Sequence, residues 1–136
     1  MNRWCNQFRL QQEKRVIDVY AKVAIGSTGA PTLSAVNSKG VLSVTRNGTG
    51  LYTFVFGTNT ALPKDTYVKV LHVGAVFNSG SSAPAAPIFN IAADSVATAN
   101  VCSIQIQFRD AANAAADPAS GEVMYMDFCL GDSTAP

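Results

Sequence analysis

The sequence predicts an all-β protein, an antiparallel β-sandwich or jelly-roll-like barrel of about seven or eight short strands. Apolar and polar residues alternate with a period of two in several short runs. Turn-forming Gly, Pro, Asn and Ser residues separate these runs, and no convincing helix is found in the interior of the chain. A chain of 136 residues, 48% of them hydrophobic, is long enough for one domain with a real core.

The domain is expected to span residues 16–136, behind an N-terminal arm of residues 1–15. The arm is polar with scattered apolar positions, and its sequence is compatible with an extended segment or a short helix. Two aromatic residues, Trp4 and Phe8, together with Arg9, are candidate interface residues. They could anchor the arm on a neighbouring molecule or fold back onto the sheet of their own chain.

The first strand is expected at Val16–Ile25, where apolar and polar positions alternate. Turn residues in Gly26–Pro31 end it, and Thr32–Val36 is a candidate short strand. Tyr67–Phe77 is a long, nearly continuous apolar run, which is typical of a central strand. Ile88–Ile91 is expected to form a brief strand.

The strongest local signal is a hairpin within Gly40–Phe56. Two β-rich runs flank Asn47-Gly48, a dipeptide that tolerates the positive φ angles of a tight turn, and a longer loop from Asn47 to Gly50 gives the same faces. One face is expected to hold Leu42, Val44, Arg46, Leu51, Thr53 and Val55, and the other Val41, Ser43, Thr45, Tyr52, Phe54 and Phe56. Both faces are too apolar for water, so the candidate interface includes Tyr52, Phe54 and Phe56, buried within the sandwich or between subunits.

Two further strands are expected at Val101–Phe108 and Glu122–Leu130, each with its apolar residues on one face. They are interpreted as the arms of a hairpin closed by residues 110–121. In that arrangement Cys102 points inward and Cys129 outward, so no disulfide is expected between them.

Composition argues against nucleic-acid and membrane partners. Only 14% of residues are charged, and the five basic residues of positions 1–22 form no dense cluster. Their net positive charge, opposite the acidic last third of the chain, suits either docking on an acidic surface or simple solvation. No run approaches the length of a transmembrane helix and no export signal is evident, so synthesis in the cytoplasm with reduced thiols is expected.

No motif indicates catalysis, a cofactor or a metal. The single histidine, His72, lies in an apolar strand, where a structural role is more common than a catalytic one. The possible zinc ligands Cys5, Cys102, Cys129 and His72 include no local pair. The acidic residues around the last loop, Asp110, Asp117 and Glu122, lack calcium-binding spacing and are expected to be solvated. We therefore expect a protein that is not an enzyme.

The hairpin segment 40–56, and Phe108–Val123 followed by an apolar strand, resemble segments of small virion proteins of tailed bacteriophages. The resemblance covers about Val36 to Leu130. It implies a capsid decoration (cement) protein on the outer surface of the virion, whose partners are the major capsid protein and itself, as a homotrimer or, second, a dimer. The alternative implied role is a fibre or tail β module that binds a host-surface glycan or receptor.

Overall fold

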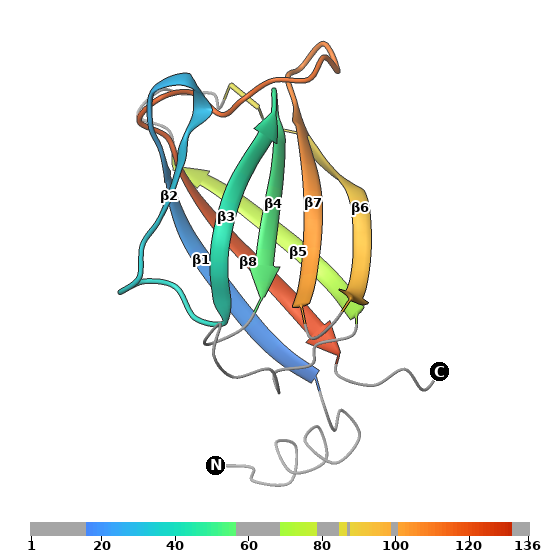
Figure 1. The fold of residues 1–136 in the computed structure, drawn as a ribbon. Coiled ribbons are helices and arrows are strands. Elements are labelled where there is room, and N and C mark those ends of the chain that lie inside the picture. The colour runs from blue at the N-terminus through green and yellow to red at the C-terminus, as the bar shows by residue number, and fades with distance from the viewer. Residues whose placement is uncertain (1–15, 57–68, 79–84, 87, 99–100, 132–136) are drawn as a thin grey trace, which may run out of the picture.

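The computed structural model describes residues 16–56, 69–78, 85–86, 88–98 and 101–131. These residues form two four-stranded antiparallel sheets, which confirms the predicted all-β sandwich (Figure 1). Sheet A contains, in spatial order, β2 (Pro31–Leu33), β1 (Val16–Ile25), β8 (Val123–Gly131) and β5 (Lys69–Asn78). Sheet B contains β3 (Val41–Gly48), β4 (Leu51–Phe56), β7 (Val101–Arg109) and β6 (Ile88–Thr98).

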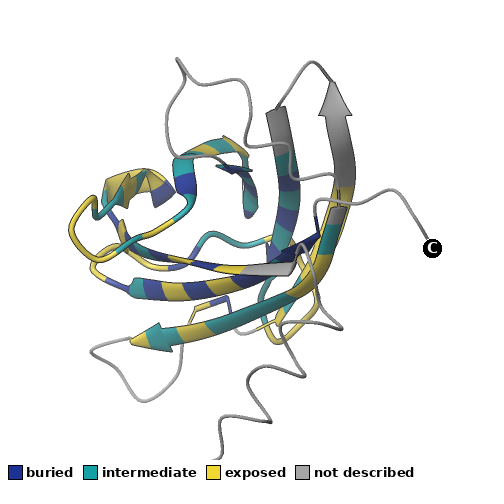
Figure 2. Ribbon diagram, turned by 90° about the horizontal axis from the view of Figure 1, so that it is seen from below, coloured by how far each residue is buried: buried dark blue, intermediate teal, exposed yellow. Residues whose placement is uncertain are grey.

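The strands of sheet A run obliquely behind those of sheet B (Figure 1). Buried and exposed residues alternate along the strands, so each sheet has one face toward the core and one toward solvent (Figure 2). The core residues come from both sheets. They are Val19, Ala21, Val23, Ile25, Val41, Tyr52, Phe54, Phe56, Ala86, Ile104, Ile106, Phe108, Met124, Met126, Phe128 and Leu130.

Aromatic rings join the two sheets at the centre of the core. Phe128 of β8 packs against Phe54 and Phe56 of β4, with ring centroids 5.1 Å and 4.9 Å apart. Phe108 of β7 meets Tyr52 edge-on at 5.5 Å. Tilted and edge-on contacts of this kind add to the free energy gained by burying the rings. The apolar faces predicted for Val101–Phe108 and Glu122–Leu130 are therefore confirmed for the described side chains, because both point into one core.

The first predicted strand and the turn after it are confirmed. β1 pairs with β8 along its whole length, from Val16 opposite Gly131 to Ala24 opposite Val123. A 3-10 turn, η1 (Ser27–Gly29), follows it and leads into the short strand β2.

β3 and β4 form the predicted hairpin, but the turn lies two residues later than Asn47-Gly48. Gly48 pairs with Leu51, so Thr49 and Gly50 occupy the turn. Gly50 adopts φ +67°, a conformation that glycine reaches without steric cost.

A bulge in β3 overturns the predicted faces for residues 43–46 of this hairpin. The register shifts between Arg46 and Gly48, so that Arg46 lies opposite Tyr52 and Val44 opposite Phe54. The inserted residue moves the side chains of residues 43–46 to the other face of the sheet. A second register shift, between Val41 and Ser43, returns Val41 to the predicted core side opposite Phe56. Val44 and Arg46 therefore share the core side with the buried aromatic residues instead of lying opposite them.

The two last strands do not form a hairpin. β7 pairs with β4 and β6 in sheet B, whereas β8 pairs with β1 and β5 in sheet A. The segment 110–122 therefore crosses from one sheet to the other. Cys129 lies on β8 in sheet A and the backbone of Cys102 on β7 in sheet B; the Cys102 side chain is outside the described residues, and the disulfide prediction stays untested.

The long apolar run predicted as a central strand at Tyr67–Phe77 lies, among the described strands, at the edge of sheet A. Among the described strands, β5 is hydrogen-bonded only to β8. A register shift between Val70 and His72 places Val70 with Val73 on the core side and leaves Leu71 half exposed. The brief strand predicted at Ile88–Ile91 extends to Thr98 as β6, the other edge strand on this side of the sandwich.

Candidate functional site

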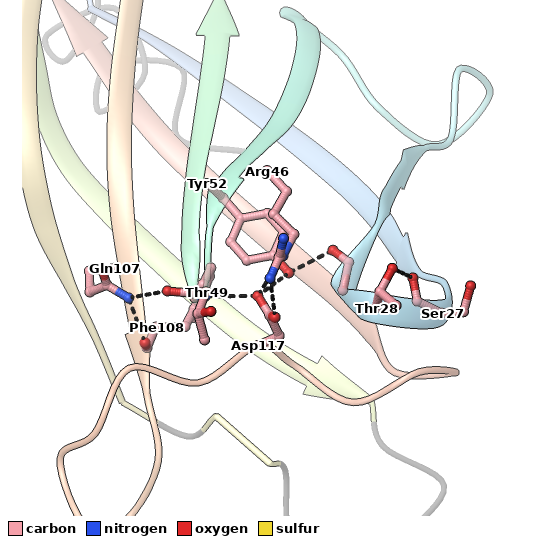
Figure 3. A network of polar contacts seen from close by, with 10 residues as sticks. Ser27, Thr28, Arg46, Thr49, Tyr52, Gln107, Phe108 and Asp117 are labelled. Atoms are coloured by element: carbon pink, nitrogen blue, oxygen red, sulfur yellow. Dashed lines mark hydrogen bonds and ion pairs between the residues drawn. The ribbon is translucent and has the colours of Figure 1, made fainter.

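A network of polar contacts closes one end of the sandwich (Figure 3). Asp117 lies in the crossover between β7 and β8 and accepts two hydrogen bonds from the guanidinium group of Arg46. The Nε–Oδ1 distance is 2.9 Å and the Nη2–Oδ2 distance is 2.7 Å. The backbone N–H of Gly50, in the β3–β4 turn, donates to Oδ1 at 2.7 Å. One carboxylate thus fixes the crossover to the hairpin.

The hydroxyl group of Tyr52 connects this network to η1. Its oxygen lies 2.7 Å from the carbonyl oxygen of Gly29 and 3.2 Å from Oδ1 of Asp117, and its single proton can be donated to either. Gly29 has φ +75°, and a Cβ atom there would lie 2.7 Å from Cγ of Asp117 and 2.9 Å from the tyrosine hydroxyl. Glycine is therefore required for both conformation and space.

Charge and burial change the pKa values in this network. The hydrogen bonds from Arg46 hold the pKa of Asp117 below its ordinary value of 3.8, and those bonds raise the pKa of Arg46. Burial, with the Asp117 charge as a second cause, raises the pKa of Tyr52 well above 10. Near neutral pH the site therefore holds an ion pair beside a protonated phenol.

This arrangement is suited to holding loops together. Each oxygen of the carboxylate has a donor, and the arginine is bound in a bidentate, charge-assisted geometry. Gln107 reinforces the same end by donating to the carbonyl oxygens of Thr49 and Phe108 at 3.1 Å and 3.0 Å. Among the described residues, no group of three His, Cys, Asp or Glu side chains is placed to hold a metal ion.

The sequence predicted that the acidic residues around the last loop are solvated. In the structure each of them instead accepts hydrogen bonds from the protein. Glu122 is only 4% exposed, and its carboxylate accepts hydrogen bonds from the backbone N–H groups of Ala85 (3.0 Å) and Ala119 (2.8 Å). Asp110 accepts from the backbone N–H of Ala114 at 2.9 Å. Together with Asp117, these carboxylates fix backbone instead of surrounding an open loop.

The outer face of sheet A carries a second cluster, of exposed apolar and aromatic residues. Tyr125 lies opposite Val76 on one side and Lys22 on the other, and Tyr20 is opposite Asp127, two residues further along β8. The three large residues, Tyr20, Val76 and Tyr125, are 51%, 65% and 41% exposed, and we call them the outer-face patch.

Charged residues border the outer-face patch. The ammonium group of Lys22 lies 5.6 Å from the centre of the Tyr125 ring, within the range of a cation–π contact. Asp127 extends over Gly74, where any Cβ atom would collide with the carboxylate, and lies 3.9 Å from Nε2 of His72. Both of these side chains are mostly exposed.

The outer face of sheet B differs in chemistry. Its central cross-strand rows hold Thr45, Thr53 and Gln105, and Ser43, Val55 and Ser103. None of these six residues is charged, and none is aromatic. The two faces of the sandwich therefore offer different surfaces, and among the side chains that the structure describes only those on the outer face of sheet A combine exposed rings with charges. A shallow, open hollow of about 330 Å³ lies away from both faces, near Leu33 and Gly40.

Three candidate interface residues proposed from the sequence are core residues. Tyr52 and Phe54 are 0% exposed and Phe56 is 3% exposed, all within this single chain. The sequence left open whether these residues are buried within the sandwich or between subunits. They are buried within the sandwich, so they present almost no surface to a second molecule. Trp4, Phe8 and Arg9 lie outside the described residues.

Sequence reasoning missed the outer-face patch. Tyr20 alternates with the buried residues of β1, and Tyr125 alternates with the buried residues of β8. The available signal was an aromatic residue at a solvent-facing position in each of two strands. Recognising that these positions are adjacent required the pairing of β1 with β8, which alternation alone does not give.

Comparisons with known proteins gave no relative: no family model, no curated protein and no solved structure matches this chain. In the described part of the chain, no helix has the length and apolar character needed to cross a membrane.

Proposed function

We propose that this protein is a bacteriophage capsid decoration (cement) protein, which binds the assembled shell of the major capsid protein on the outside of the virion. The observation that carries the proposal is the outer-face patch, Tyr20, Val76 and Tyr125, on the outer face of sheet A. The phage identity of the partner comes from the resemblance of the hairpin and crossover segments to virion proteins.

The patch has the chemistry of a protein interface. Tyrosine is enriched at the centre of such interfaces, and charged residues are more common at the rim. Here Lys22, His72 and Asp127 lie beside the exposed rings and Val76. Covering these apolar atoms with protein removes them from water, while the bordering charges select the partner and its orientation.

Such a protein acts by binding and needs no covalent step. A ligand that binds the assembled shell more tightly than its separate subunits stabilises the shell by mass action. The satisfied polar network around Asp117 supports this role, because it holds three loops at one end of the sandwich in fixed positions. Self-association as a homotrimer, or second as a dimer, belongs to the same proposal.

The outer-face patch also favours a second candidate, a fibre or tail module that binds a host-surface glycan. Exposed tyrosine rings can stack on the apolar faces of sugars, and neighbouring carboxylates accept hydrogen bonds from sugar hydroxyl groups. Tyr20, Tyr125 and Asp127 provide both groups on neighbouring strands.

The two candidates are separated by adding purified protein to shells that lack it and, in parallel, to immobilised host-surface glycans. For a decoration protein we expect saturable binding at a fixed ratio to capsid subunits and a higher temperature of shell disassembly. Glycan binding without shell binding would establish the second candidate and overturn the first. Sedimentation equilibrium of the free protein tests the trimer.

A further inference from the structure

The β5 edge of sheet A is long, and no described strand pairs with its outer side. β5 has ten residues, and among the described strands its only hydrogen-bonded neighbour is β8. An edge strand of this length, with apolar residues and unpaired backbone groups, is normally covered or interrupted by charge. By sequence, β5 holds only two ionisable residues, Lys69 at its start and His72.

The hydrophobic core is also less well covered beside this edge. The inward residues of β8 are at most 1% exposed, whereas Val73, Ala75 and Phe77 of β5 are only partly buried. Across the sandwich, Ile91 of β6, which lies opposite the buried Ile106, is 49% exposed. A further strand beside β5 would cover apolar surface as well as pair backbone groups.

The chain that precedes β1 has the reach to provide that strand. Val16, Gly131 and Lys69 form one row across sheet A, so the start of β1 is two strand spacings, about 10 Å, from the start of β5. Residues 1–15, fully extended, would span roughly 50 Å. β5 and β1 run in the same direction, because each is antiparallel to β8. A segment that ends beside the start of β5 therefore approaches antiparallel to it.

The residue pattern of this segment matches the edge. In an extended strand, Trp4, Phe8 and Leu10 share one face, and Arg3 and Arg9 lie on the other. The first face suits the uncovered apolar side of β5. The second would bring positive charge to the outer face of sheet A, near the exposed carboxylate of Asp127. The polar residues 11–15 would then form the connection past the end of β8.

From the open edge, the reach and the residue pattern, we propose that residues 2–10 add to β5 of their own chain as an antiparallel strand, with Trp4 and Phe8 over the open side of the core. This inference does not depend on the proposed function. The register that puts Trp4 opposite Phe77 and Phe8 opposite Val73 places Cys5 opposite Val76. A shift of two residues keeps the same faces and places Cys5 opposite Asn78.

Disulfide trapping tests the pairing directly. Val76→Cys and Asn78→Cys are made separately and oxidised in dilute, folded full-length protein, and the linked peptides are identified by mass spectrometry. We expect an intramolecular bond from Cys5 in at least one variant, formed at least about tenfold faster than in the control Thr32→Cys, on the opposite edge strand. Links only between chains, or no preference over the control, would overturn the proposal.

Hydrogen exchange provides a second measurement that does not use an engineered cysteine. Removing residues 1–13 is expected to speed exchange in β5 peptides by about tenfold or more, while β2 peptides stay unchanged. Equal exchange of β5 in the full and shortened chains would contradict the added strand. The β2 peptides show in the same experiment whether the shortened protein remains folded.

Discussion

Replacing Asp117 by asparagine removes the charge that joins the crossover to the hairpin while keeping the size of the side chain. The amide can still accept a hydrogen bond from the N–H of Gly50. In the native protein the guanidinium group of Arg46 donates to both carboxylate oxygens. The NH₂ group of asparagine cannot accept one of these two hydrogen bonds. Asp117→Asn therefore tests whether the ion pair stabilises the fold.

The expected loss is about 2 kcal/mol of unfolding free energy at pH 7, which is typical for hydrogen bonds to a charged group. The estimate is kept near the lower end of that range because the Asp117 side chain is 21% exposed and partly screened by water. For a chain of this length, the melting temperature should fall by roughly 6–10 °C.

The same pair predicts a pH dependence. The folded-state pKa of Asp117 is lower than the ordinary value of 3.8, so its contribution is present above about pH 4. The contribution is lost as the pH falls through the lowered folded-state pKa, when the carboxylate becomes protonated. The stability difference between the native protein and Asp117→Asn should therefore shrink below pH 4.

Urea unfolding followed by circular dichroism between pH 2 and pH 8 measures both effects. Asp127→Asn is the matched control, because it removes a carboxylate that is 64% exposed, and its stability at pH 7 should change by less than about 0.5 kcal/mol. Equal stability of Asp117→Asn and the native protein at pH 7 would refute the stabilising role. A difference that persists unchanged down to pH 2 would refute its assignment to the carboxylate charge.

Two further predictions concern packing, one within the Asp117 network and one at the opposite end of β3. Tyr52→Phe removes the hydroxyl bonded to Gly29 and should cost about 1 kcal/mol at pH 7. Because folding raises the pKa of Tyr52, the native protein should lose this contribution as the pH rises above 10. The variant has no hydroxyl to ionise, so the stability difference between the two proteins should shrink at alkaline pH, and a constant difference would contradict the prediction. Gly40→Ala should lower stability by more than about 1 kcal/mol, since φ is +78° and a Cβ would collide with Val19. In the same thermal-unfolding assay Gly48→Ala, with open space around it, should change little, and equal effects would refute the steric argument.

Much of the fold follows from short-range patterns in the sequence. Period-two alternation correctly identified β1 and the inward faces of β7 and β8, because these strands are regular and each has one buried face. The turn residues at 26–31 likewise correctly ended the first strand. Such signals depend only on neighbouring residues, so no knowledge of strand pairing is needed.

The errors arise where one residue or a distant strand decides the outcome. The bulge before Gly48 reversed the faces of residues 43–46 in β3, and no local pattern in the sequence marks that bulge. The apolar run of β5 suggested a central strand, but strand order depends on contacts with β8, far along the chain.

The candidate site was the hardest feature to predict. Asp117 is 71 residues from Arg46 and 65 residues from Tyr52, and only the fold brings them together. The outer-face patch similarly joins β1, β5 and β8. Its composition was visible in the sequence, whereas its continuity was not.

The most direct test of the proposed function compares two lysine substitutions in binding to shells that lack the protein. Val76→Lys puts a charge into the outer-face patch, and Thr45→Lys puts the same charge on the exposed outer face of sheet B. We predict that Val76→Lys weakens shell binding by at least about tenfold, as expected for a charge buried in an apolar contact, and that Thr45→Lys binds like the native protein. Native affinity for Val76→Lys, measured on protein with an unchanged melting temperature, would contradict docking through the outer face of sheet A.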